Sequence, residues 1–363
     1  MSANEALGLL AHEQALLRGT VVPYTPGQSL ARWYPMALDA SGAEPLLAWR
    51  YLGERLLTAA FFQDNFSAQE AADTRVCYTP LSALAQFDAG QGQGLRSLQP
   101  SAFVFHVSRC GSTLVTQMLS QLPSCVALSE PPVLDSFFRL LHAQPLGWDG
   151  AAVFRQLLAA LGQARRASEQ HLVVKLDCWH APWMPWLRLV YPDVPMVFLY
   201  REPQQVLDSH TRQRGLQMVP GLLPLGPLQL TGQMQHAGDL DGYAQQVLGA
   251  IFRTAVDLAG ASGLQLLNYS QLPAVVWTEL MPALGIACSA ALLQAVQKRG
   301  QFHAKHGSAQ FVGDPKVDVP ARSGPACQEL AACYAALEEK RLAADLAAGW
   351  LNPQEPWMDA PLC

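Results

Sequence analysis

The sequence is poor in charge, and the charge that it carries is nearly balanced. Only 15% of its 363 residues are charged, with 24 lysines and arginines against 29 aspartates and glutamates, which gives a net charge of −5. Because half of the residues are hydrophobic, the chain can bury a large core, and general disorder is excluded. The negative net charge argues against a nucleic acid partner, so any anionic ligand needs a local cluster of donors.

Two other features are missing from the sequence. The eight cysteines include no Cys-x-x-Cys pair, which excludes the usual spacing of a zinc site or a redox dithiol. No uncharged apolar run is long enough to span a bilayer, and the first ten residues lack the pattern of a signal peptide. We therefore expect a cytoplasmic protein with reduced cysteines and no membrane partner.

Residues 1–98 differ in composition from the rest of the chain. Apolar residues at helical spacing between Leu7 and Leu17 predict a short amphipathic helix. Prolines and aromatic residues are mixed in the part that follows, and we interpret it as irregular but packed. The run Gly90–Gly94 predicts a flexible connector. We therefore predict an N-terminal extension, 1–98, that packs on or caps a main domain formed by residues 99–363.

After the connector, short apolar runs alternate with helical patterns. The runs that we predict to be strands are 103–107, 126–128, 171–176, 195–200 and 264–268. Strands that are apolar throughout are typical of a parallel sheet covered on both faces. The sequence therefore predicts an α/β fold with a doubly wound parallel sheet flanked by helices.

A polar turn follows the first of these strands and leads into an amphipathic helix. Its residues are Ser108, Arg109, Cys110, Gly111, Ser112 and Thr113. Such a turn aims backbone N–H groups and the positive end of the helix dipole at one point, and the hydroxyl and guanidinium groups add donors. The turn predicts a phosphate or sulfate site, although an ordinary capped turn with a solvated arginine explains it equally well. It is not a Walker A loop, since the lysine of that motif is missing.

A second candidate anion site follows the strand predicted at 195–200. Arg201 ends that strand, Pro203 suits the first turn of a helix, and Ser209 lies about two turns further on. An arginine at a strand end more often caps carbonyl groups or pairs with a carboxylate, so this motif is weak by itself. In open α/β sheets, however, ligands bind at this edge, which predicts a second phosphate site there.

Together these two motifs resemble the sulfotransferase family. In that family the first loop grips the 5′-phosphosulfate of 3′-phosphoadenosine 5′-phosphosulfate (PAPS), and an arginine–serine pair like Arg201 and Ser209 takes the 3′-phosphate. Tyr269, within 267–272, is similar to a family residue near the adenine. The resemblance covers roughly residues 101–320. It implies a P-loop NTPase-like sulfotransferase fold and a metal-independent, in-line transfer of a sulfuryl group from PAPS to a hydroxyl or amine of a small-molecule acceptor.

The sequence departs from the family pattern in two regions. Arg109 stands in the first loop, as in bacterial and tyrosylprotein-type members, where the small cytosolic enzymes carry lysine. The C-terminal glycine-rich loop of the cytosolic members is absent. Its nearest substitute, residues 303–316, offers Lys305 and Lys316 as nucleotide contacts, or it is simply a solvated basic loop.

Sulfuryl transfer needs donors aimed at the bridging oxygen, where charge develops, and a base for the acceptor hydroxyl. Arg109, with the hydroxyls of the first turn, suits the first role. Glu130, which ends the second strand, is the first candidate for the base, although it could equally pair with Arg109. Asp177 is the second candidate, and the resemblance implies that Lys175 stabilises the leaving oxygen.

Two other functions stay open at this stage. The protein could be an ATP- or GTP-dependent kinase of small molecules, with Asp177 holding Mg²⁺, or a nucleotide-binding protein without catalysis. We interpret His106 as a core histidine. The tryptophans at 179, 183 and 186 form either helix core or an apolar acceptor wall. Nothing in the sequence indicates the acceptor or the oligomeric state. We expect the residues that determine acceptor specificity to lie in the first hundred residues and in 215–242.

Overall fold

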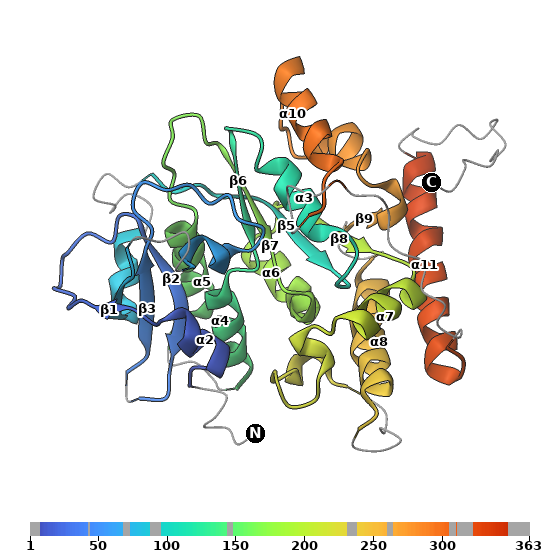
Figure 1. The fold of residues 1–363 in the computed structure, drawn as a ribbon, viewed down its shortest axis with the longest axis horizontal. Coiled ribbons are helices and arrows are strands. Elements are labelled where there is room, and N and C mark those ends of the chain that lie inside the picture. The colour runs from blue at the N-terminus through green and yellow to red at the C-terminus, as the bar shows by residue number, and fades with distance from the viewer. Residues whose placement is uncertain are drawn as a thin grey trace.

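The strands of this protein form two separate sheets. The computed structural model describes residues 8–42, 44–67, 73–87, 96–143, 148–230, 238–259, 264–304, 310 and 322–347. Within them lie a four-stranded sheet and a five-stranded sheet, which occupy different parts of the molecule (Figure 1).

The five-stranded sheet is parallel throughout. Its strands are β5 (Pro100–His106), β6 (Cys125–Ser129), β7 (His171–Lys175), β8 (Met196–Tyr200) and β9 (Gln265–Asn268), in the order β6-β7-β5-β8-β9. The residues of the central strands are almost all buried, because helices cover the sheet. This explains why each strand is a continuous apolar run and not an alternating one. The predicted α/β fold with a parallel sheet is confirmed.

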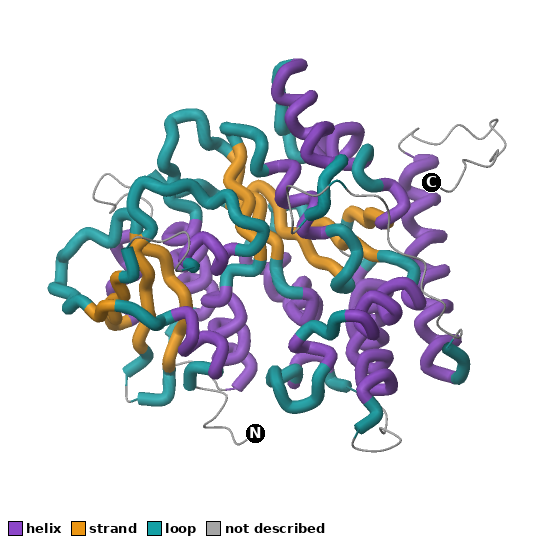
Figure 2. The backbone as a smooth tube through the Cα atoms, in the orientation of Figure 1, coloured by secondary structure: helices purple, strands orange, loops and turns teal. Residues whose placement is uncertain are grey.

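Helices flank this sheet on both sides. They are α3 (Ser112–Leu119), α4 (Pro132–Ala143), α5 (Gly150–Leu161), α6 (Met184–Val190), α7 (Pro203–Arg212), α8 (Leu240–Leu258), α9 (Met281–Ala283), α10 (Ala290–Gly300) and α11 (Pro325–Ala347). In the view of Figure 1, α3 and α10 lie above the strands and α6 and α8 below them, and Figure 2 shows the strands running between these layers. No helix in the described ranges is long and apolar enough to cross a membrane.

The N-terminal segment forms the smaller sheet, so the prediction of irregular structure there was wrong. After α2 (Ala11–Leu16), the strands are β1 (Thr20–Val21), β2 (Trp33–Asp39), β3 (Leu46–Tyr51) and β4 (Arg75–Pro80), in the order β1-β4-β3-β2. The prolines are compatible with strands because of their positions. Pro35 lies at a register shift on the edge strand β2, and Pro80 ends β4, where a missing N–H costs little.

Buried hydrogen bonds attach β2 of this smaller sheet to α4 and to a residue just after α5. The backbone N–H of Leu38 in β2 donates to Ser136 Oγ of α4 at 2.9 Å. Gln163 Nε2 donates to the carbonyl of Trp33 at 2.7 Å. The predicted division at residues 98 and 99 stays a prediction, and the connector Gly90–Gly94 lies outside the described residues.

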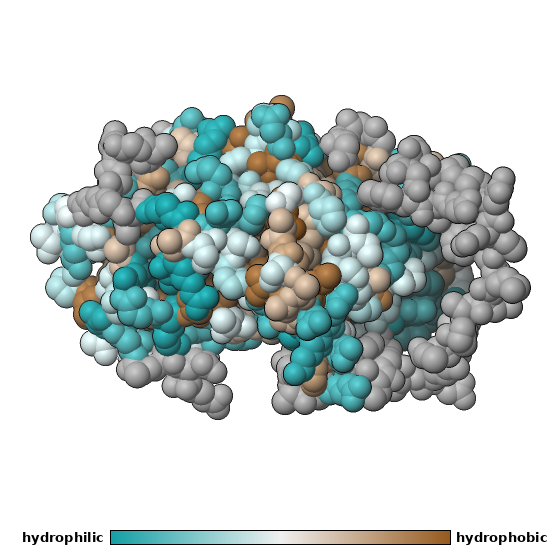
Figure 3. Space-filling model, turned by 90° about the horizontal axis from the view of Figure 1, so that it is seen from above, coloured by the Kyte–Doolittle hydropathy of each residue, from teal (hydrophilic) through white to brown (hydrophobic). Residues whose placement is uncertain are grey.

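The surface is mixed in character. Seen from above, hydrophilic and hydrophobic side chains are interspersed, and the hydrophobic ones occur mostly in small groups (Figure 3). This distribution fits a chain whose long apolar runs are buried in the parallel sheet and its helices.

Candidate active site

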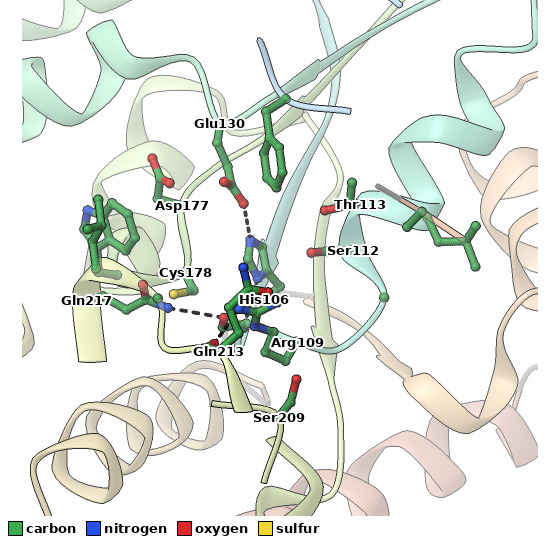
Figure 4. A pocket seen from close by; sticks show the side chains of 18 of the residues that line it. His106, Arg109, Ser112, Thr113, Glu130, Asp177, Cys178, Ser209, Gln213 and Gln217 are labelled. Atoms are coloured by element: carbon green, nitrogen blue, oxygen red, sulfur yellow. Dashed lines mark hydrogen bonds and ion pairs between the residues drawn. The ribbon is translucent and has the colours of Figure 1, made fainter. Parts of the chain in front are cut away.

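A cavity of about 680 Å³ opens at the carboxyl edge of the parallel sheet. Parallel strands end at the same edge, so residues far apart in the sequence meet there. Each of the five strands contributes a cavity-lining residue within two positions of its carboxyl end, and Figure 4 shows two of them, Glu130 and Asp177. In chain order these are Ser108, Glu130, Asp177, Arg201 and Tyr269. The cavity thus unites the two motifs that the sequence analysis predicted to be anion sites.

The turn between β5 and α3 has an unusual backbone. Ser108, Arg109 and Gly111 all have positive φ, at 71°, 50° and 82°. The left-handed region costs a non-glycine residue of order 1 kcal/mol or more, so two of these residues are strained. Left-handed residues in a turn direct successive N–H groups into a concave anion-binding surface, and the first N–H groups of α3 add to it because they have no carbonyl partner within the helix.

Cys110 is the one residue of this turn whose side chain points into the core. Its thiol donates to the carbonyl of Leu199 at 3.3 Å, and burial raises its pKa to about 11. The thiol is therefore protonated and packs as a small side chain. Of Cys110, only the backbone is suited to contact a ligand.

Gly111 allows the turn to approach a neighbouring segment closely. A Cβ atom on Gly111 would lie 2.4 Å from Leu272 Cδ1 and 3.2 Å from Tyr269 Cδ2. Gly111→Ala should therefore lower the free energy of unfolding by about 1–3 kcal/mol more than a backbone penalty alone. Urea unfolding measures this. Gly285→Ala is the matched control, because Gly285 has φ of 64° but no atom within 4 Å of its Cβ position; equal losses in the two variants would contradict the prediction.

Arg109 braces the turn against α7. Its Nη2 donates to the carbonyl of Gln213, just past the end of α7, at 2.6 Å, while the side chain also lines the cavity. Burial lowers the pKa of Arg109. Arg109 therefore fixes the turn, and the cation that pairs with Glu130 is a different residue, Lys175.

Arg201 lies beside the same turn and is held on three sides. Its Nε donates to Gln205 Oε1 at 2.8 Å, and its Nη1 donates to the carbonyl of Arg109 at 3.2 Å. Its guanidinium carbon lies 4.1 Å from the centre of the Tyr269 ring, a cation–π distance. The cavity therefore holds an oriented cation next to an aromatic face, with Ser209 of α7 also in its wall.

A carboxylate on α11 links the strands that carry Arg201 and Tyr269. Glu338 accepts a hydrogen bond from the hydroxyl of Tyr200 and another, at 2.9 Å, from Asn268 Nδ2. Tyr200 and Asn268 are the last residues of β8 and β9, directly before Arg201 and Tyr269. One side chain outside the cavity thus connects the two strand ends that line it.

Glu130 faces the turn from the end of β6. Its Oε1 lies 2.8 Å from Lys175 Nζ and 3.2 Å from His106 Nε2. The Lys175 ammonium is fully buried and also donates to Thr113 Oγ1 at 3.2 Å. His106 Nδ1 accepts from the backbone N–H of Ser108, which leaves the ring proton on Nε2, towards Glu130. Burial raises the pKa of Glu130, but Lys175 and His106 outweigh it and hold the pKa at about 2, so Glu130 is ionised.

Asp177 differs sharply from Glu130 in its electrostatics. Burial raises its pKa well above the ordinary value, the carboxylates of Glu130 and Asp135 raise it further, and Lys175 opposes them only in part. Its Oδ2 lies 3.9 Å from His180 Nδ1, and the other nitrogen of that ring is 3.1 Å from Asp135 Oδ1. The cavity thus contains one carboxylate with a low pKa and one with a raised pKa.

The three tryptophans after Asp177 lie in two different environments. Trp183 and Trp186 pack against Phe138 in the core, with ring centres 5.1 and 6.1 Å from it. Trp179 lines the cavity instead, and its Nε1 donates to Asp135 Oδ1 at 2.6 Å. The helix-core interpretation therefore holds for Trp183 and Trp186, and the acceptor wall stays a prediction for Trp179.

Several cavity residues were missed by the sequence analysis. His106 is buried, as expected, but it lines the cavity and contacts Glu130. Gln217 donates to Ser108 Oγ at 3.2 Å from the region where we expected specificity. His12 and Phe61 come from the N-terminal segment. Lys305 and Lys316 lie outside the described residues, so their predicted nucleotide contacts stay predictions.

Comparison with known proteins finds similarity only at the level of structure. No family model and no curated protein matches the sequence. Among solved structures, the chain is similar to the sulfotransferase domain of the Synechococcus PCC 7002 olefin synthase (18% identity, 68% of this chain and 98% of that one, TM-score 0.38). It is also similar to the sulfotransferase domain from the curacin biosynthetic pathway (17%, 66% and 99%, 0.40) and to a sulfotransferase from Alicyclobacillus acidocaldarius (18%, 70% and 99%, 0.37). At such low identities and TM-scores, the function has to be inferred from the cavity itself.

Proposed function

We propose that this protein transfers a sulfuryl group from PAPS to a hydroxyl or amine of a small-molecule acceptor, in line and without a metal. The observation that supports this most is that Arg109 and Arg201, which are 92 residues apart, both line one cavity. A donor with phosphate groups at both its 3′ and 5′ positions needs two anion sites that face the same space. Guanidinium groups facing separate spaces would have been incompatible with it.

The cavity residues suit the two ends of such a donor. Arg201 and Ser209 would take the 3′-phosphate, since a buried, oriented guanidinium binds phosphate well. Tyr269 would lie against the adenine. The backbone N–H groups from Cys110 to Thr113 and the hydroxyls of Ser112 and Thr113 would hold the 5′-phosphosulfate. The strained turn fits this role because left-handed residues in a turn can direct successive N–H groups towards an anion.

Lys175 would act on the developing charge. PAPS supplies the activated sulfuryl group, and negative charge develops on the bridging oxygen as the bond to it breaks. The Lys175 ammonium lies next to the start of α3, bonded to Thr113, which is where the turn would hold that oxygen. A buried cation that needs no reorientation stabilises such charge effectively.

Two carboxylates can take the proton of the acceptor. In Figure 4, Glu130 lies between Asp177 on one side and Ser112 and Thr113 on the other, and both carboxylates line the cavity. Glu130 is ionised but weakly basic in the free protein, because Lys175 and His106 hold its pKa at about 2. Asp177, with its raised pKa, is the stronger base. We keep Glu130 as the first candidate, because it is joined directly to Lys175 at the anion turn.

Ligand-induced stabilisation tests this proposal. The product nucleotide 3′,5′-ADP should raise the melting temperature without Mg²⁺, because a ligand that binds only the folded state stabilises it. Arg201→Ala should weaken this binding by about 10- to 100-fold, which corresponds to the loss of a charged hydrogen-bonded contact. Arg166→Ala is the control, since Arg166 is exposed and does not line the cavity.

The alternatives give different results in the same experiment. Stabilisation by ATP only with Mg²⁺, abolished in Asp177→Ala, would indicate a kinase. If neither nucleotide raised the melting temperature, both transferase functions would be wrong.

A further inference from the structure

The N-terminal segment contributes directly to the cavity wall. His12 and Leu16 of α2 line it, as do Phe61 and Gln63, which precede the small sheet's last strand. A segment that only covered the outside of the parallel sheet and its helices would not reach this cavity. We therefore ask which function these four residues have in the cavity.

A buried chain of charged side chains fixes α2 against this wall. Glu13, which is fully buried, pairs with Arg139 of α4, and Arg139 Nε also donates to Asp135 Oδ2 at 3.0 Å. Asp135 in turn lines the cavity and accepts from Trp179. At the other end of α2, Arg50 donates to the carbonyl of Leu16 at 2.6 Å. Helix α2 is thus held by Arg139 and by Arg50, and the first of these contacts leads through Asp135 to Trp179.

Phe61 is fixed beside the predicted transfer point. Its ring centre lies 5.1 Å from the Lys175 ammonium. The two carbonyls at Thr58 and Ala59 accept from Gln117 Nε2 of α3, at 3.3 and 3.0 Å. The segment 58–61 therefore lies along α3. It places the ring of Phe61 over the buried Lys175, where the ring excludes water.

The wall that results is apolar, and its charges are already paired. Leu16, Phe61 and Trp179 supply apolar surface. Among the described residues at this end, Asp135 is paired with Arg139 and Glu130 with Lys175. Burial lowers the pKa of His12 and raises the pKa of Asp177, which favours the neutral form of both side chains. A charged group on an acceptor would lose its water here without gaining a counter-ion, which is costly.

We propose that α2 and the segment around Phe61 form the acceptor wall, and that the acceptor is a neutral molecule with an apolar ring or chain beside its hydroxyl group. This inference rests on the proposed sulfuryl transfer and deepens it. It assigns acceptor recognition to a part of the chain that lies before the parallel sheet.

A matched set of probes tests the acceptor class. The probes are 4-methylbenzyl alcohol, 4-(hydroxymethyl)benzoate and 4-(aminomethyl)benzyl alcohol, which share one ring and one hydroxyl but differ in charge. With ³⁵S-labelled PAPS, kcat/KM for the neutral alcohol should exceed both charged probes by about 10-fold or more, which reflects the cost of burying an unpaired charge. A charged probe that is used equally well or better would overturn the inference.

Two variants test the wall itself. Leu16→Ala should raise KM for 4-methylbenzyl alcohol by about 10-fold, since buried methyl and methylene groups are lost, and it should leave KM for PAPS unchanged. Leu189→Ala is the control, because Leu189 is 80% exposed on α6. An unchanged KM for the alcohol in Leu16→Ala, or an equal rise for PAPS, would overturn the proposed wall.

Calorimetry separates this inference from the proposed function. Binding of 4-methylbenzyl alcohol to the full-length protein needs no turnover and should weaken in Leu16→Ala but not in Leu189→Ala. If 3′,5′-ADP fails to bind, the proposed function is wrong whatever the alcohol does. If 3′,5′-ADP binds and Leu16→Ala leaves alcohol binding unchanged, only the acceptor wall is wrong.

Discussion

Glu130→Gln is expected to lower turnover by about 10²-fold or more, while 3′,5′-ADP still stabilises the protein. Glutamine keeps the size of the side chain, but it cannot accept the proton of the acceptor. It also removes the negative charge that faces Lys175 at 2.8 Å. The rate constant kcat for labelled sulfuryl transfer measures the first effect, and a thermal shift with nucleotide measures the second.

Two further variants keep this result interpretable. Glu130→Gln leaves the buried Lys175 ammonium without its carboxylate, and breaking a buried ion pair is itself destabilising. The double variant Glu130→Gln/Lys175→Met should recover part of the stability but none of the turnover. Asp177→Asn is the competing test. If it lowers kcat by 10²-fold or more and Glu130→Gln does not, the base is Asp177.

Arg139→Met should lower the free energy of unfolding by about 3–5 kcal/mol at pH 8. Methionine roughly preserves the length of the side chain, but it removes the cation that lies between Glu13 and Asp135. Both carboxyl groups are buried, and Glu13 has no exposed surface. Two buried carboxylates without their cation are costly, and urea unfolding measures the loss. A change below about 1 kcal/mol, the value typical of an exposed pair, would contradict this account.

The pH dependence of stability gives an independent check on the same cluster. Burial raises the pKa of Glu13 from 4.5 to about 7, although Arg139 opposes it. The folded protein therefore holds this proton more tightly than the unfolded chain, so the stabilisation is complete below about pH 4.5 and is lost as the pH rises through 7. The free energy of unfolding of the wild type, relative to Glu13→Gln, should fall by about 3 kcal/mol between pH 4.5 and 8. A pH-independent difference would show that Glu13 does not titrate in this way.

The parallel sheet could be predicted from the sequence because each strand carries its own local signal. Runs such as 103–107 and 195–200 are apolar throughout, and the strands β5 and β8 are indeed buried on both faces. Arg201 could be placed for a related reason. A residue directly after a parallel strand lies at the ligand-binding edge wherever that strand is in the sheet.

The small sheet and the buried cluster of Glu13, Arg139 and Asp135 could not be predicted in this way. The prolines hid β2 and β4, since only the structure shows that Pro35 lies at a register shift on an edge strand. Arg139 contacts Glu13 from 126 residues away, and no pattern along the chain connects them. The positive φ of Ser108 and Arg109 has no sequence signal either, because non-glycine residues adopt it only when their surroundings impose it.

Glu338 has a consequence for how distant changes act on the cavity. Because its carboxylate joins the last residues of β8 and β9, the spacing between Arg201 and Tyr269 depends on how α11 is seated. A change that shifts α11 would therefore alter the positions of Arg201 and Tyr269 in the cavity wall. The packing of α11 thus contributes to the geometry of the cavity, although Glu338 itself does not line it.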